Sequence, residues 1–140
     1  MNGIEFEKRM CHLLRGCSQK NIKRWISWAE ECTEEGQYVD FVECPKNEAI
    51  SAWLDSYYAS IYFIKQEFGA DIAKQIIDLS DLPLCLYSYE MRNTAKLLRD
   101  KATVEQIFQA IEDGSLVSDG KLPTMQDVKE DLHKEKNWER

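Results

Sequence analysis

Apolar residues recur every three or four positions along most of the chain, which is the period of an amphipathic α-helix. The clearest pattern lies between residues 47 and 69, where the steps are 4, 3, 4, 3 and 4 at Ile50, Leu54, Tyr57, Ile61, Ile64 and Phe68. Further aromatic residues widen this face at Trp53, Tyr58 and Tyr62. An apolar surface this broad needs neighbours on more than one side. We therefore expect this helix at the centre of an all-α bundle.

Capping residues, prolines and glycines mark the ends of the predicted helices. Their starting signals stand at Asn2, Ser18, Asn47, Asp71, Pro83, Thr103 and Thr124. The sixth helix is expected to turn Val104, Ile107, Phe108 and Ile111 inward. The pattern predicts six or seven helices in one domain of residues 1–140, with a charged C-terminal helix or tail at about 125–140.

Residues 37–44 are the only stretch in which the sequence suggests an extended segment. It holds the β-forming residues Tyr38, Val39, Phe41 and Val42, although their alternation is imperfect. A lone strand cannot satisfy its backbone hydrogen bonds, so a short strand and an extended loop packed on helices both stay open.

Composition and charge limit the class of protein. The 140 residues are 44% hydrophobic and 31% charged, which is typical of a folded globular domain. The net charge of −7 argues against a general affinity for nucleic acid or for an anionic membrane. No apolar run approaches the ~20 residues that cross a bilayer, and the charged first 16 residues do not match a signal peptide. We expect a soluble protein.

The five cysteines stand at Cys11, Cys17, Cys32, Cys44 and Cys85. Their number is odd, none forms a Cys-x-x-Cys pair, and several fall at apolar helix positions. Cysteines in such positions behave as small hydrophobic residues. We expect reduced thiols, no disulfide and a cytoplasmic location.

Metal-binding patterns are incomplete. Glu130 and His133 form one Glu-x-x-His step, but a di-iron carboxylate site needs two such steps and two further glutamates. A zinc site built from Cys11, His12, Cys17 and Cys32 lacks the tight Cys-x₂₋₄-Cys spacing of structural zinc. We expect neither a metal nor a cofactor.

Acidic residues cluster at the end of the second predicted helix, at Glu30, Glu31, Glu34 and Glu35. The Glu31–Glu34 step resembles half of the metal site in all-α nucleotide pyrophosphohydrolases of the MazG type. The following helix offers Asp55 with Tyr58 where that family has a second acidic pair, so the chain is not assigned to it. The cluster leaves two alternatives open. One is a metal-dependent hydrolase, and the other is an acidic mimic of DNA that uses Asp40 and Glu43 as well and inhibits a nucleic-acid-binding protein.

We favour a third function, a non-enzymatic protein-binding or regulatory module. Trp28 lies off the apolar stripe of its helix, and Trp138 stands in the charged tail. Tryptophans on a surface are enriched at protein interfaces. The predicted partner-binding residues are Trp28, Glu30, Glu31, Glu34, Glu35 and Trp138. The expected partner is a protein, with self-association left open. Nucleic acid is disfavoured because Arg92, Lys96 and Arg99 come late on their helix, whereas recognition helices read bases from their first half.

Overall fold

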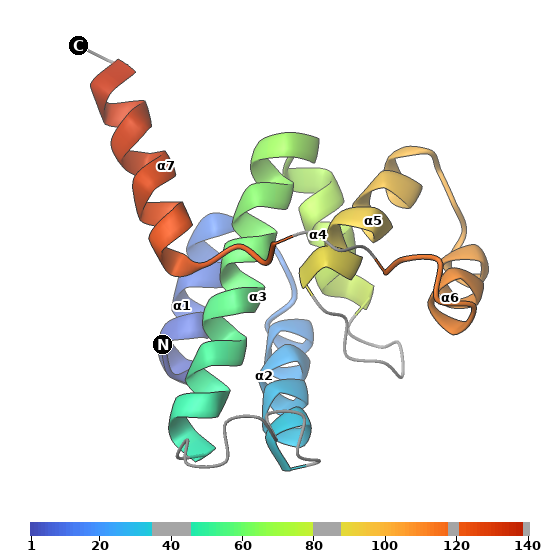
Figure 1. Cartoon of the computed structure of the whole chain (residues 1–140), viewed down its shortest axis with the longest axis horizontal. Helices are drawn as coiled ribbons and strands as arrows, with labels where there is room; N and C mark the ends of the chain where they lie inside the picture. The colour runs from blue at the N-terminus through green and yellow to red at the C-terminus, as the bar shows by residue number, and fades with distance from the viewer. Residues whose placement is uncertain (35–45, 80–87, 118–120, 139–140) are drawn as a thin grey trace.

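A computed structural model describes residues 1–34, 46–79, 88–117 and 121–138. Within these ranges the chain forms seven helices and no strand: α1 (Gly3–Leu13), α2 (Gln19–Glu34), α3 (Lys46–Phe68), α4 (Ala70–Asp78), α5 (Ser88–Arg99), α6 (Val104–Glu112) and α7 (Met125–Trp138) (Figure 1). The prediction of an all-α bundle is confirmed. The possible extended segment at 37–44 and the helix start at Pro83 lie outside the described residues.

The central position predicted for the helix at 47–69 is also confirmed. Helix α3 contacts α1, α2, α4, α5 and α7, and Figure 1 shows it among them, with α6 and α7 at opposite ends of the molecule. The side chains that face its neighbours are almost fully buried, with Leu54 and Tyr57 at 0%, Ile61 at 1% and Ile64 at 3% exposure. The stripe therefore forms the middle of the core.

Trp25 joins three helices in that core. Its indole ring meets the Tyr57 ring of α3 edge to face, with 5.0 Å between centroids, and its Nε1 donates a 3.2 Å hydrogen bond to the carbonyl of Ile77 in α4. Leaving a buried N–H without such a partner costs about 1–3 kcal/mol. The apolar stripe of α2 is thereby anchored against both α3 and α4.

Three predicted helix starts match the structure in detail. Asn2 Oδ1 accepts a 2.9 Å hydrogen bond from Glu5 N. Thr103 and Gln106 form a complete capping box at α6, with bonds of 2.8 and 3.2 Å. Thr124 and Asp127 do the same at α7 with an aspartate in place of the usual glutamate or glutamine. The hydrogen bond that Thr124 N donates to the Asp127 carboxylate is the main cause that lowers the pKa of Asp127.

Two local predictions are wrong. Asp71 does not cap α4, because the N-cap is Gly69, whose φ of 96° lets the chain turn directly from α3 into α4. Asp71 instead lies in the first turn of α4. Val104 does not face inward, since it is 58% exposed. Helix α6 lies at the edge of the bundle, so only a narrow part of its stripe, centred on the fully buried Ile107, reaches the core.

Basic residues of α5 contact the end of α3. The Arg92 guanidinium pairs with the Glu67 carboxylate at 2.6 and 3.0 Å, and this hydrogen bond lowers the pKa of Glu67. Arg99 lies over the Phe68 ring, 5.4 Å from its centroid. Both arginines are more than half exposed, so these contacts position α5 while adding little stability.

Candidate functional site

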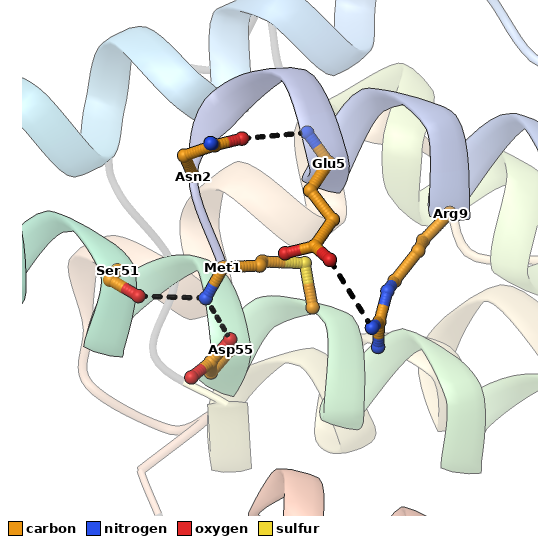
Figure 2. Close-up of polar contacts among 6 residues, drawn as sticks. All are labelled: Met1, Asn2, Glu5, Arg9, Ser51 and Asp55. Carbon is orange, nitrogen blue, oxygen red and sulfur yellow. Dashed lines mark hydrogen bonds and ion pairs between the residues drawn. The ribbon is translucent and has the colours of Figure 1, made fainter.

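The N-terminus lies against the central helix rather than in solvent (Figure 2). The Met1 ammonium donates hydrogen bonds of 2.7 Å to Ser51 Oγ and 2.7 Å to Asp55 Oδ1. The Met1 side chain is only 2% exposed, whereas Asp55 is 38% exposed. Ser51 and Asp55 stand four residues apart, one turn of α3, so both face the ammonium. This site was not predicted from the sequence.

A surface depression of about 480 Å³ adjoins the Met1 ammonium. It is formed by the starts of α1 and α3 together with Glu30 of α2, and its lining residues are Met1, Asn2, Gly3, Glu30, Asn47, Ile50 and Ser51. One carboxylate of the acidic cluster therefore borders this depression. The charge beside it, the Met1 ammonium, is already paired with Asp55.

The acidic cluster does not form one continuous surface in the part of the chain that the structure describes. Glu30 and Glu31 are both exposed, but adjacent helix residues point about 100° apart. Glu30 faces the depression beside α1 and α3, and Glu31 does not line it. Glu34 ends α2, and its side chain lies outside the description, as does the whole of Glu35. Neither the hydrolase nor the DNA-mimic alternative gains a specific observation from this layout.

Trp28 is half-buried. Its ring meets Trp25 edge to face, with 5.2 Å between centroids, and packs against the main core. The Trp28 side chain is therefore partly exposed to solvent and partly packed on the core. Trp28 thus packs on the core although it lies off the apolar stripe of its helix, and Trp28→Ala should lower stability as well as any association.

Helix α7 divides into two halves. The first half packs on α3: Val128 is 2% exposed among Ala59 and Tyr62, and the Tyr62 hydroxyl donates a 2.8 Å hydrogen bond to Asp131 Oδ2. The four residues Leu132–Glu135 that follow are all exposed, with Leu132 at 44%. Figure 1 shows this second half pointing away from the bundle. Trp138 is the last residue of α7, and its side chain lies outside the description.

Glu130 and His133 lie on an exposed face of α7 and line a shallow groove with Gln126, Lys129 and Lys134. Among the described residues, no three His, Cys, Asp or Glu side chains are grouped as a metal site would require. The described cysteines Cys11, Cys17 and Cys32 are free thiols, and Cys44 and Cys85 lie outside the description. None of the described helices is long and apolar enough to cross a membrane.

Comparisons of the chain with protein-family models, with curated proteins and with solved structures found no match.

Two contacts important for the candidate surfaces escaped sequence reasoning. The Met1–Asp55 pair spans 54 positions and the Tyr62–Asp131 pair spans 69, so no local pattern links their members. A weak signal existed for each: Asp55 is an acid on a largely apolar helix, and Asp131 follows Val128 by three residues on the same face of α7.

Proposed function

We propose that the protein is a non-enzymatic protein-binding module whose partner docks on the second half of α7. The observation that supports it is the exposure of one full helical turn, Leu132–Glu135, in a helix whose first half is docked on α3. A helix that lies on a bundle normally buries an apolar residue in each turn. Here Leu132 is the apolar residue of that turn and is 44% exposed.

A helical segment as short as the second half of α7 is unstable in water by itself. Helices shorter than ~12–15 residues are marginal in water, because nucleation is costly. The second half of α7 is helical because it continues a half that is capped by Thr124 and fixed to Tyr62. Such an arm is prearranged for helix-in-groove recognition, since the docked half already orients the free half. Trp138, which ends the arm, is the aromatic candidate for its anchor.

Helix α2 offers further candidate contacts, namely the partly exposed Trp28 and the exposed acidic residues Glu30 and Glu31. Charges of this kind act mainly on the rate of association, through long-range attraction of a basic partner. Because Glu30 and Glu31 point in different directions, Glu30→Lys and Glu31→Lys distinguish which side of α2 the partner approaches. Only the variant on that side should slow association in low salt.

Site-specific photocrosslinking tests the proposal. A photoreactive amino acid at Leu132 should give a discrete protein–protein adduct in the host cell. The matched control places it at Glu105, an exposed residue of α6 at the opposite end of the molecule. An adduct with the mass of two chains would identify the partner as a second copy. Equal adduct at both positions, or none at Leu132, contradicts the proposal.

A further inference from the structure

Two cysteines, Cys11 and Cys17, flank the turn between α1 and α2. Cys11 belongs to the last turn of α1, and Cys17 lies between the end of α1 at Leu13 and the start of α2 at Gln19. Gly16 between them has a φ of +84°, a left-handed conformation that glycine adopts without strain. The chain thereby folds back, and Cys17 returns to the helix that it has just left.

Short contacts fix the position of Cys17. Its backbone N–H donates a 3.2 Å hydrogen bond to the carbonyl of Leu14, and its Sγ lies 3.9 Å from the carbonyl oxygen of Met10. The Lys65 ammonium holds the same end of α1 through a 3.0 Å hydrogen bond to the carbonyl of Leu13. The Cys17 thiol is thus held over the last turn of α1, which carries Cys11.

The two thiols lie at the same edge of the core. Cys17 Sγ is 3.9 Å from the carbonyl oxygen of Met10, the residue before Cys11, and both cysteine side chains are half-buried and pack against the main core. Burial, followed by the charge of Cys11, raises the pKa of Cys17, while the Lys74 ammonium partly opposes this rise. Cys32, by contrast, is 2% exposed and lies in the core.

We propose that Cys11 and Cys17 form a reversible disulfide by exchange with a low-molecular-weight disulfide such as glutathione disulfide. The Cys17 thiol lies against the helical turn that carries Cys11, and Cys17 lies outside both helices, so its side chain can rotate toward Cys11 without breaking a helical hydrogen bond. This site goes beyond the proposed function, because it involves neither α7 nor the acidic surface of α2.

The exchange proceeds in two steps that balance. One protein thiolate attacks a sulfur of glutathione disulfide, which forms a mixed disulfide and releases one glutathione thiolate. The second protein thiol loses its proton and attacks the protein sulfur of the mixed disulfide, which forms the Cys11–Cys17 bond and releases the second glutathione. Two electrons pass to glutathione disulfide, and two protons end on the two glutathione thiols.

Proximity, rather than acidity, drives this reaction. A raised pKa reduces the thiolate fraction of Cys17 at neutral pH, so its attack is slow. The equilibrium nevertheless favours the disulfide, because the second step is intramolecular and the two thiols have an effective concentration on the order of millimolar or above. We therefore expect half of the protein to carry the Cys11–Cys17 disulfide when [GSH]²/[GSSG] is on the order of millimolar or above.

Peptide mapping of the full chain tests the proposal. Reduced protein is equilibrated in glutathione buffers of graded ratio, quenched with acid, alkylated and digested with trypsin. Cleavage after Arg9, Arg15 and Lys20 places Cys11 in the peptide of residues 10–15 and Cys17 in that of residues 16–20. The expected product is these two peptides joined by a disulfide and free of glutathione.

Variants separate an internal disulfide from simple glutathione capture. Cys17→Ser should accumulate a glutathione adduct on Cys11, Cys11→Ser should accumulate one on Cys17, and Cys32→Ser should behave as the unmodified chain. Circular dichroism checks that each variant is folded, and alanine replaces serine where it is not. A lasting glutathione adduct on the unmodified chain, or full alkylation of both thiols at the most oxidising ratio, would overturn the proposal.

Discussion

The phenolic hydroxyl of Tyr62 donates a 2.8 Å hydrogen bond to Asp131 Oδ2, and this bond joins the central helix to α7. Tyr62 is 4% exposed and packs beside Ala59 and Val128, so this hydrogen bond lies next to the apolar contact between α3 and α7. The exposed turn of α7 starts with the next residue, Leu132. The pair therefore marks the boundary between the docked half and the free half of α7.

Removing this hydrogen bond should loosen α7. Tyr62→Phe keeps the ring and deletes the donor, and we expect it to lower the free energy of unfolding by about 1–2 kcal/mol. Asp131→Asn, which keeps an acceptor oxygen without the charge, is the matched control and should cost less. Urea denaturation at neutral pH measures both. A Tyr62→Phe protein as stable as the unmodified chain would show that the bond does not hold α7.

The same pair predicts a pH effect. Burial, then the hydrogen bond and the charge of Asp131, raise the pKa of Tyr62 above its ordinary value. In the unfolded chain this tyrosine ionises near pH 10, while the folded chain keeps it protonated. Its contribution to stability is therefore complete below about pH 10 and is lost as the pH rises toward the folded pKa. Tyr62→Phe should lose stability less steeply above pH 10 than the unmodified chain.

Blocking the Met1 ammonium should destabilise the chain that begins at this residue. Acetylation removes the charge that Ser51 and Asp55 bind, and it leaves the Asp55 carboxylate unpaired. Because Asp55 is 38% exposed, solvent screening keeps the expected loss near about 1 kcal/mol. Thermal unfolding of acetylated and free protein measures it. In Asp55→Ala the same acetylation should cost less, and an equal cost in both backgrounds would exclude the ion pair as the cause.

Lys101, just after the end of α5, has the left-handed backbone conformation that glycine usually occupies. Lys101 has a φ of 63°, and the bonds Lys101 N to Leu98 O and Ala102 N to Leu97 O, both 3.0 Å, form a Schellman motif. Lys101→Gly should stabilise the protein by about 0.5–1 kcal/mol, because relief of left-handed strain exceeds the added freedom of the unfolded chain. Gly114→Ala, at a φ of +74° with no atom near the new methyl group, should act in the opposite direction. A destabilised Lys101→Gly variant would contradict the assignment.

The core prediction uses the centre of α3. Ile61 is 1% exposed, and Ile61→Ala should lower the free energy of unfolding by about 2–5 kcal/mol, since it leaves a cavity among packed neighbours. Ile4→Ala, at a side chain that is 69% exposed, is the control and should change it by less than about 0.5 kcal/mol. Equal effects from the two variants would mean that Ile61 does not lie in the core.

Local patterns predicted the helices well because capping and periodicity are local properties. Asn2, Thr103 and Thr124 cap the helices that the sequence assigned to them, and the stripe from Leu54 to Ile64 is buried. The prediction that Asp71 caps α4 was wrong, because Gly69, two residues earlier, lies between α3 and α4 and is the N-cap of α4. The prediction that Val104 faces inward was wrong, because periodicity identifies the apolar face of α6 but not how much of that face a neighbour covers.

The candidate surfaces were less predictable, because they depend on distant segments. The sequence showed that Trp28 lies off the apolar stripe of α2, but only the three-dimensional structure shows that it packs against Trp25 and the main core. Charge counts grouped Glu30 with Glu31, whereas the fold turns Glu30 alone toward the start of α1. The sequence placed Trp138 in the charged tail, but it gave no sign that α7 leaves the bundle after Asp131.

Amide hydrogen exchange along α7 tests the central claim most directly. In the isolated protein, amides of residues 132–138 should exchange much faster than those of residues 128–131, and equally at two protein concentrations tenfold apart. In the complex captured by crosslinking at Leu132, protection of residues 132–138 should rise by about tenfold or more, with no change in α6. Uniform protection of α7 in the isolated protein, or unchanged exchange of residues 132–138 in the complex, would contradict a free helical arm that binds a partner.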